Sequence, residues 1–231
     1  MPQALTSRRA ILRDAIGIGI GVASYGISFG ALGVTSGLSI LQTQALSSLM
    51  FTGASQFALV GVIGAGGSAA SAIAAALLLG FRNFPYALRM SSLVKPHGLR
   101  RFSAAQLTID ESTAMGLAHE KGRDGATGGR YAFWATGISV FVFWNAATLI
   151  GALAASGAGD PKVFGLDAAI AAGFVALVWP QFQGGLERKT AALAFLIALT
   201  SISFVRPGLP ILLAGAVALV MGLVHRPGDA R

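Results

Sequence analysis

Long apolar stretches alternate with short polar or charged segments along the whole chain. Because a helix rises about 1.5 Å per residue, about 20 apolar residues cross the roughly 30 Å hydrocarbon core of a bilayer. The pattern therefore predicts an all-α fold, a polytopic membrane helical bundle of about seven spans that forms one transmembrane domain over residues 1–231. The predicted spans are residues 15–35, 44–65, 69–94, 131–155, 165–182, 190–205 and 209–224.

Residues 104–118 do not fit this alternation, because they are too polar for an ordinary span and too apolar for a plain loop. We expect a re-entrant or half-crossing helix there. The last two predicted spans are short and are separated by Arg206, Pro207 and Gly208. They form either two tilted spans or one helical hairpin.

Composition supports the membrane class and limits the alternatives. Charged residues make up only 11% of the chain, against about 25% in soluble domains, and the mean hydropathy is +0.69. The net charge of +8 comes from Lys and Arg residues at the ends of apolar runs, as is typical of the flanks of membrane spans. We therefore expect the protein to lie in a lipid bilayer and not to bind nucleic acid. The absence of Cys excludes disulfides and thiolate metal sites.

Glycines punctuate the first predicted span at a helical spacing. Gly17 and Gly21 are four residues apart, as are Gly26 and Gly30, so each pair shares a helix face. Small residues at this spacing allow close helix packing in lipid. The alternative is an unwound stretch that exposes backbone groups to a solute.

Two parts of the chain resemble each other and indicate an internal repeat with halves at 15–94 and 131–224. Phe-Gly-Ala-Leu at 29–32 precedes Gln56 and Phe57, and Ile-Gly-Ala-Leu at 150–153 precedes Gln181 and Phe182. If 104–118 does not cross, three spans precede the second half, and the halves are inverted in the membrane. That segment also decides the orientation, since the positive-inside rule places the N-terminus inside if it crosses and outside if it does not.

Enzyme signatures are weak. Residues 26–30 match G-x-S-x-G, but they lie in an apolar helix, and the histidines His97, His119 and His225 all lie on flanks. The chain contains no zinc-peptidase, Walker A or dinucleotide motif. We therefore expect no enzyme, no cofactor and no metal site.

Arg82 is the clearest polar break in a predicted span. The apolar stretch before it, residues 69–79, covers only about 16 Å, so the helix must continue through Arg82 and Asn83. An Arg at the centre of a span costs about 2.5–3.5 kcal/mol, so it normally faces a partner or a water-filled cavity. The alternative is that Arg82 reaches an interface, with Pro85 marking a kink.

Further polar residues lie in or near the spans. Asp110 and Glu111 could bind and release a proton, or they could pair with Arg82. The alternative is that they only mark the start of a helix, where carboxylates are favoured. Gln56, flanked by small residues, offers a donor and an acceptor, and Asn145 and Gln181 are similar cases. For these amides the alternative is hydrogen bonding between helices.

Together these residues resemble the AzlC-type large subunit of branched-chain amino-acid exporters. The resemblance covers most of the chain and departs at 81–84, where the family often has N-x-R-H and this chain reads Phe-Arg-Asn-Phe. The matching segments are 28–30 (Ser-Phe-Gly), 51–57 (Phe-Thr-Gly-Ala-Ser-Gln-Phe), Arg82 and Asn83 with Pro85 and Tyr86, and 110–112 (Asp-Glu-Ser).

The resemblance implies several properties that composition does not. It implies a multi-pass protein of a bacterial or archaeal cytoplasmic membrane that exports branched-chain or related apolar amino acids. It also implies a small AzlD-type membrane subunit as partner and the proton gradient as energy source.

The resulting hypothesis is a secondary transporter with its site near the bilayer midplane. Arg82 or the N-terminus of a broken helix would hold the substrate carboxylate, and Gln56, Ser55 and exposed backbone carbonyl groups would meet the ammonium. Asp110 or Glu111 would load a proton, and Phe29, Phe57 or Trp144 would face the substrate side chain. The rivals are an exporter or channel for another small solute and a membrane scaffold without transport. The predicted substrate-binding residues are Ser28, Gly30, Ser55, Gln56, Arg82, Asn83, Asn145 and Gln181, and the predicted proton-coupling residues are Asp110 and Glu111.

Overall fold

The structure is a computed structural model that describes residues 8–122, 124–157, 179, 182, 184–206 and 208–224. Every regular element within these residues is a helix, so the predicted all-α class is confirmed for the described part. Gln181 and nearly all of the predicted span 165–182 lie outside the described residues. The helices are α1 (Arg8–Thr35), α2 (Ile40–Leu49), α3 (Ala54–Gly64), α4 (Ala69–Gly80), α5 (Asn83–Val94), α6 (Arg100–Gln106), α7 (Asp110–Glu120), α8 (Gly125–Gly157), α10 (Gly185–Ser201) and α11 (Leu209–Val224).

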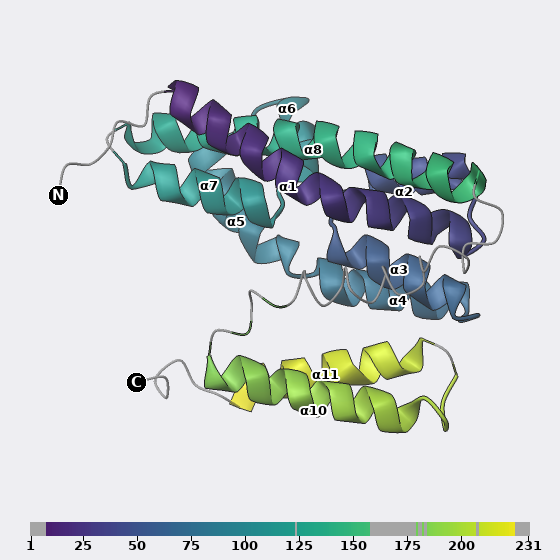
Figure 1. The fold of residues 1–231 in the computed structure, drawn as a ribbon. Helices are drawn as coiled ribbons and strands as arrows, with labels where there is room; N and C mark the ends of the chain where they lie inside the picture. The colour runs from purple at the N-terminus through teal and green to yellow at the C-terminus, as the bar shows by residue number, and fades with distance from the viewer. Residues whose placement is uncertain are drawn as a thin grey trace.

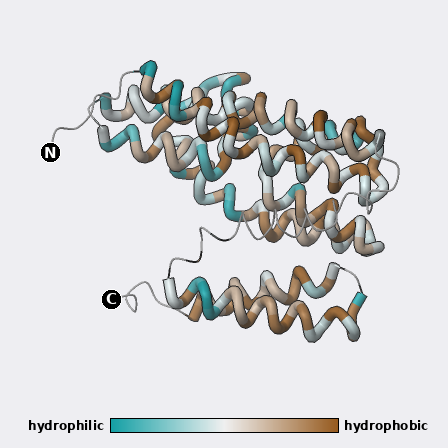
Figure 2. The backbone as a smooth tube through the Cα atoms, in the orientation of Figure 1, coloured by the Kyte–Doolittle hydropathy of each residue, from teal (hydrophilic) through white to brown (hydrophobic). Residues whose placement is uncertain are grey.

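Two long helices, α1 with 28 residues and α8 with 33, form the spine of the molecule. Both are long and apolar enough to cross a membrane, which confirms the spans predicted at 15–35 and 131–155. They pack side by side and are parallel (Figure 1). Both begin at the end of the molecule where the N-terminus lies. Figure 2 shows hydrophilic residues gathered at that end.

Glycines set the contact between α1 and α8. A Cβ atom on Gly30 would clash with the Thr148 carbonyl oxygen, and one on Gly151 would clash with the Ile27 carbonyl oxygen. The two contacts are reciprocal, because each glycine meets the residue three positions before the other. The packing interpretation of Gly30 is therefore correct, and the two similar tetrapeptides meet at one crossing.

The predicted span 44–65 is wrong as a single crossing, because the chain turns back halfway. Thr43 of α2 packs on Gly33, Phe51 at the turn contacts Phe141, and Gly64 at the end of α3 has returned to Ser36. The physical reason is a helix break at 50–53. There, Gly53 has φ 63° and ψ −97°, a conformation that residues with side chains rarely adopt.

The predicted span 69–94 consists of two helices, α4 and α5, bent by 43° at their junction. α4 lies beside α3, with Gly80 next to Ser55. α5 continues to the end where α8 begins, and there the Arg130 Nε donates a hydrogen bond to the Leu93 carbonyl oxygen at 2.7 Å. Counting this bent pair as one span, the described residues contain up to three candidate membrane spans, so the count of seven stays a prediction.

Residues 104–118 form a second hairpin, which agrees with the expected re-entrant or half-crossing segment. α6 and α7 are separated by residues 107–109, and the Gln106 Nε2 near this turn donates to the Ser48 carbonyl oxygen at 2.7 Å. α7 then returns along α8, so that Gly128 lies beside the His119 carbonyl oxygen.

The α6–α7 hairpin starts and ends at the opposite end from the α2–α3 hairpin, and both turns lie at the middle of the spine (Figure 1). Because both segments turn back, only the α4–α5 pair runs the full length between α1 and α8. The inverted arrangement expected for non-crossing 104–118 is therefore wrong for this helix pair, which is parallel.

α10 and α11 pack against each other as a helical hairpin. α11 also contacts α4, where Gly215 meets Leu78 and Gly208 meets Ser71. Two tilted spans would pack in the same way, so the number of membrane crossings that this hairpin makes stays a prediction.

The glycine crossing makes a prediction about stability. Gly30→Ala should lower the free energy of unfolding by about 1–3 kcal/mol, because its Cβ would force α1 away from the α8 backbone. Gly21→Ala is the matched control, since a Cβ there meets nothing within 4 Å. Thermal unfolding of the purified proteins in detergent measures the difference, and equal midpoints would contradict the tight crossing.

Candidate functional site

Three breaks in the helices surround one small cavity at the middle of the spine. Its volume is about 70 Å³, several times the roughly 10–15 Å³ that one water molecule needs. The lining comes from α1, the α2–α3 turn, the α4–α5 bend, the α6–α7 turn and α8. The lining residues are Val22, Tyr25, Phe51, Thr52, Gly53, Ala54, Phe57, Arg82, Ile109, Asp110, Glu111, Val140 and Trp144.

Arg82 joins the three breaks. Its Nη1 forms a salt bridge with the Asp110 Oδ2 at 2.8 Å, and its Nη2 donates to the Thr52 carbonyl oxygen at 3.3 Å. Arg82 lies at the α4–α5 bend, Thr52 in the α2–α3 turn and Asp110 directly after the α6–α7 turn. The predicted pairing of Arg82 with Asp110 is therefore present, and one guanidinium holds both hairpin tips.

The two acids open α7, so the helix-start interpretation is also correct. Carboxylates are stabilised there by the partial positive charge of the helix N-terminus. Asp110 keeps its second oxygen, Oδ1, buried and without a hydrogen-bond partner among the described residues. Glu111 also lines the cavity, and no salt bridge to it is found in the described part of the chain. The site thus holds one paired and one unpaired carboxylate beside a single guanidinium.

Helix N-termini face the cavity from both sides. α3 begins at Ala54 and α7 at Asp110, and both residues line the cavity. The helices run from there toward opposite ends of the spine, so both present their partial positive charge to the same space. This arrangement favours an anionic group between the hairpin tips.

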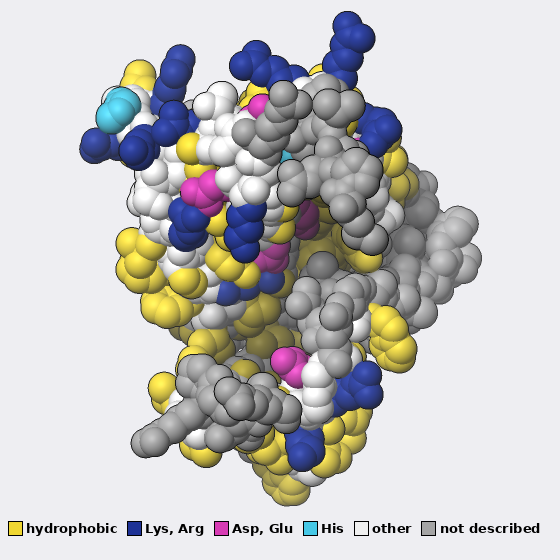
Figure 3. Space-filling model, turned by 90° about the vertical axis from the view of Figure 1, so that its left-hand side faces the viewer, with side chains coloured by type: hydrophobic (Ala, Val, Ile, Leu, Met, Phe, Trp, Pro, Cys, Tyr) yellow, Lys and Arg dark blue, Asp and Glu magenta, His cyan; other side chains and the backbone are white. Residues whose placement is uncertain are grey.

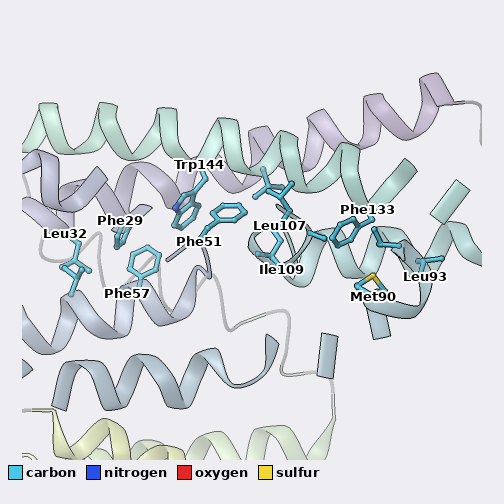
Figure 4. Close-up of a cluster of buried hydrophobic side chains, with 14 residues drawn as sticks. Phe29, Leu32, Phe51, Phe57, Met90, Leu93, Leu107, Ile109, Phe133 and Trp144 are labelled. Atoms are coloured by element: carbon cyan, nitrogen blue, oxygen red, sulfur yellow. The ribbon is translucent and has the colours of Figure 1, made fainter. Parts of the chain in front are cut away.

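Aromatic side chains form the apolar wall of the site (Figure 4). The Trp144 ring stacks on Phe29 with a centroid distance of 5.9 Å and meets Phe57 edge-on at 6.2 Å. Phe51 packs edge-on against Phe141 at 5.1 Å. Of the predicted apolar residues, Phe57 and Trp144 line the cavity and Phe29 lies behind them. The Trp144 Nε1 is buried without a partner among the described residues.

Gln56 has a structural role, because both the oxygen and the nitrogen of its side-chain amide are hydrogen-bonded to backbone groups. Its side chain is fully buried, its Oε1 accepts from the Gly53 N–H at 3.1 Å, and its Nε2 donates to the Leu46 carbonyl oxygen at 2.9 Å. Gln56 therefore closes the α2–α3 turn, and it does not line the cavity.

Asn145 fastens α2 to α8. Its Oδ1 accepts from the Gln44 Nε2 at 3.0 Å and the Ser48 Oγ at 2.7 Å, and its Nδ2 donates to the Phe141 carbonyl oxygen at 2.9 Å. The interpretation of both amides as hydrogen bonds within the helix framework fits these contacts.

The other predicted binding residues lie outside the cavity lining. The Ser28 hydroxyl donates to the Ser24 carbonyl oxygen of its own helix at 3.4 Å, and Gly30 faces α8. Ser55 and Asn83 lie next to cavity residues, and each has a buried side-chain oxygen without a partner in the described part.

The sequence interpretation missed Val22, Tyr25 and Val140, which line the cavity from the two spine helices. A signal existed for Tyr25, because it is the one tyrosine in the first predicted span. The role of the Thr52 carbonyl oxygen could not be predicted from the sequence, because every residue type has a backbone carbonyl group.

The fold and the site describe a helical membrane protein with charged groups between broken helices. The family model described as AzlC protein matches residues 17–157, which include every cavity residue. The chain belongs to the AzlC family, which is linked to membrane transport of branched-chain amino acids. No curated protein and no solved structure matches the chain.

The role of Gln56 can be tested by stability. Gln56→Leu should destabilise the protein by about 1–3 kcal/mol, because the Gly53 N–H loses the acceptor that Gln56 provides, whereas the Leu46 carbonyl oxygen keeps its bond from the Met50 N–H. Gln42→Leu is the control, because Gln42 makes a similar side-chain contact at an exposed helix start, to the Ser39 N–H. Thermal unfolding in detergent should show the larger loss for Gln56, and equal losses would argue against its role in the turn.

Proposed function

We propose that this protein is a secondary transporter that exports branched-chain or related apolar amino acids across a bacterial or archaeal cytoplasmic membrane. The observation that carries the proposal is the ion pair of Arg82 and Asp110 at the cavity between three helix breaks. Backbone breaks at membrane depth are tolerated where they line a cavity, and transporters place substrate sites between such breaks.

In this arrangement α1, the α4–α5 pair and α8 cross the bilayer, and the two hairpins are re-entrant segments from opposite sides. Their turns then lie near the midplane, beside the bend at Arg82. The apolar character of the helices supports this multi-pass arrangement.

The charges of the site match the two ends of an amino acid. Arg82 would take the substrate carboxylate through parallel hydrogen bonds, and Asp110 would take the ammonium group. The zwitterion would thus insert into the existing ion pair, so that neither Arg82 nor Asp110 is left unpaired in a medium of low dielectric constant. A branched apolar side chain would lie against the apolar lining, which includes Val22, Phe51, Phe57 and Trp144.

The same carboxylates provide a route to proton coupling. Asp110 and Glu111 can bind either the substrate ammonium or a proton, so the two compete for one site. Competition of this kind produces exchange, in which a proton entering the cell takes the place of an amino acid leaving it. The resemblance to branched-chain exporters implies the same energy source.

Transport also requires the cavity to widen. A volume of about 70 Å³ leaves room for a few water molecules, so the hairpin tips must separate for a leucine-sized substrate. Release of Arg82 from Asp110 or from the Thr52 carbonyl oxygen would open the site toward one side at a time. Alternating access would follow from movement of one hairpin at a time.

A small AzlD-type membrane subunit completes the proposal. It rests on the resemblance and is supported by the outer face of α4 and α5. There, Leu77, Phe81, Phe84 and Leu88 are 58–69% exposed. A helix of a partner subunit or lipid chains would cover this face in the membrane.

The charge distribution supports an orientation with the N-terminus in the cytoplasm. For a non-crossing 104–118 the sequence predicted the opposite orientation, but that prediction counted 44–65 as a crossing, and this segment turns back. Arg8 packs over the Tyr131 ring and Arg130 bonds to Leu93, so the basic starts of α1 and α8 lie beside the end of α5. Loops 36–39 and 65–68 at the opposite end carry no charge. Under the positive-inside rule the basic end is cytoplasmic. The basic end carries Arg8, Arg9, Arg13, Lys95, Arg100, Arg101, Lys121 and Arg130.

Two substitutions should separate substrate binding from proton coupling in proteoliposomes. Arg82→Gln should weaken leucine binding roughly ten- to hundredfold, because one charge-assisted hydrogen bond contributes about 1.5–3 kcal/mol. Glu111→Gln should keep leucine exchange between the two sides but lose accumulation driven by a pH gradient. Radiolabelled leucine flux measures both activities, with and without the candidate small subunit.

Arg89→Gln and Glu120→Gln are matched controls, because Arg89 and Glu120 form a second ion pair between α5 and α7 away from the cavity. Both controls should transport normally. Undiminished pH-driven export by Glu111→Gln at normal protein level would refute its coupling role. Flux without stimulation by leucine on the far side would favour a channel, and normal leucine binding by Arg82→Gln would exclude Arg82 as a carboxylate ligand.

The orientation is tested by fusing reporters to the chain in bacterial cells. A fluorescent protein at the N-terminus should fluoresce, since it folds in the cytoplasm. Alkaline phosphatase inserted in loop 65–68 should be active, because it requires the oxidising side of the membrane. The reverse pattern would place the basic end outside.

A further inference from the structure

A second and larger cavity lies at the basic end of the molecule, between α5, α6 and α8. Its volume is about 530 Å³, within the range of roughly 300–1,000 Å³ that is typical of small-molecule sites. It is separate from the Arg82 cavity, with which it shares no lining residue. The lining residues are Ala87, Met90, Ser91, Val94, Lys95, Pro96, His97, Arg101, Ala104, Ala105, Thr108 and Phe133.

The lining combines an apolar interior with basic side chains. Met90, Val94 and Phe133 are apolar and buried, whereas Lys95 and Arg101 are exposed. His97 is a third basic residue, and the lining contains no Asp or Glu. An amphipathic anion fits these features. A zwitterionic amino acid fits less well, because its ammonium group would find cations and no carboxylate.

The loop that carries the basic residues is held in an unusual conformation. Lys95 has φ 48°, which makes it the one residue other than glycine with positive φ in the described part of the chain. Gly98 has φ 55°, and the Arg101 Nε donates to the Pro96 carbonyl oxygen at 3.3 Å. Lys95 caps the C-terminus of α5 in the left-handed conformation that ends many helices, and the chain turns there toward α6. The loop therefore holds Lys95 and Arg101 at the same cavity.

We propose that this cavity binds an anionic phospholipid. The lipid phosphate would lie against Lys95, Arg101 and His97, and an acyl chain would enter the apolar interior beside Met90 and Phe133. Basic pockets between membrane helices on the cytoplasmic side are known to suit anionic lipid head groups. Figure 3 shows Lys and Arg side chains gathered on this face with hydrophobic side chains beside them.

Surfaces next to the cavity extend the apolar contact. Leu99 is 84% exposed and Phe102 is 76% exposed, and both flank the basic residues along α6. In a bilayer these side chains would lie among the acyl chains, with the basic loop at the level of the head groups. The proposal thus requires a membrane protein but does not depend on transport.

A lipid bound in this cavity would stabilise the α6–α7 hairpin, which carries Asp110 and Glu111. Thr108 lines the lipid cavity, and the next residues, Ile109 and Asp110, line the Arg82 cavity. A lipid wedged between α5 and α6 would stabilise the α6–α7 hairpin in its present position. Anionic lipid should therefore raise the thermal stability of the protein.

Native mass spectrometry and thermal unfolding of the full chain in detergent test the proposal, with phosphatidylglycerol and phosphatidylcholine as probes. Phosphatidylglycerol should bind and raise the unfolding midpoint, whereas phosphatidylcholine should do neither. Lys95→Asn with Arg101→Gln should weaken phosphatidylglycerol binding at least about tenfold, since two phosphate contacts are lost. Asn tolerates positive φ, so the loop should keep its conformation.

Arg9→Gln with Lys121→Gln removes the same charge at exposed positions of the same end and should bind lipid normally. Ala105→Trp, which fills the cavity, should weaken binding without changing charge. If the Lys95 variant does not fold, Lys95→Gly, which also suits positive φ, and Arg101→Gln alone replace it. Equal binding of both lipids, equal loss in the control pair, or unchanged binding by the variants of Lys95, Arg101 and Ala105 would each overturn the proposal.

Discussion

The guanidinium of Arg82 is the interaction on which the centre of this structure depends. A chain break inside a membrane exposes backbone groups that lipid cannot satisfy. Arg82 meets this constraint at the α2–α3 turn, where it bonds the Thr52 carbonyl oxygen, and its charge is paired with the Asp110 carboxylate beside the α6–α7 turn. Arg82 thereby links the tips of the two hairpins, beside the direct hydrogen bond from Gln106 to Ser48. A ligand that binds Arg82 would therefore weaken the link between the two hairpins as well as replace the partner of the Arg82 charge.

Around this centre the structure divides into a rigid spine and two attached hairpins. α1 and α8 approach closely at Gly30 and Gly151, where a side chain on either glycine would clash with the backbone of the other helix. The α2–α3 hairpin is fastened to the spine by half-buried polar contacts such as that of Asn145. The α6–α7 hairpin meets the α2–α3 hairpin directly through Gln106, and indirectly through Arg82, which bonds both Asp110 and Thr52. Both of these links are polar and can exchange with a polar ligand.

Polar residues in the spans fall into two groups that hydropathy alone does not separate. Gln56 and Asn145 use both ends of their amides on the framework, whereas Arg82, Asp110 and Glu111 face a cavity. All five are costly in lipid, which is why the sequence singled them out. The distinction depends on hydrogen-bond partners, which for Asn145 include Gln44, 101 residues away along the chain. Arg82 and Asp110 bond to each other at the cavity, where a polar ligand can compete for both.

The helical class, the membrane setting and the pairing of Arg82 with Asp110 were predictable from the sequence. Length and hydropathy suffice for these, because the cost of a polar group in lipid does not depend on the details of packing. The tertiary structure alone decided that 44–65 turns back, that α1 and α8 run parallel, and that Gln56 closes a turn. The reversal at residues 50–53 depends on one backbone conformation, at Gly53, and on contacts with distant segments. The backbone conformation and the long-range contacts leave the hydropathy along the chain unchanged. They can therefore be recognised only in the packed structure.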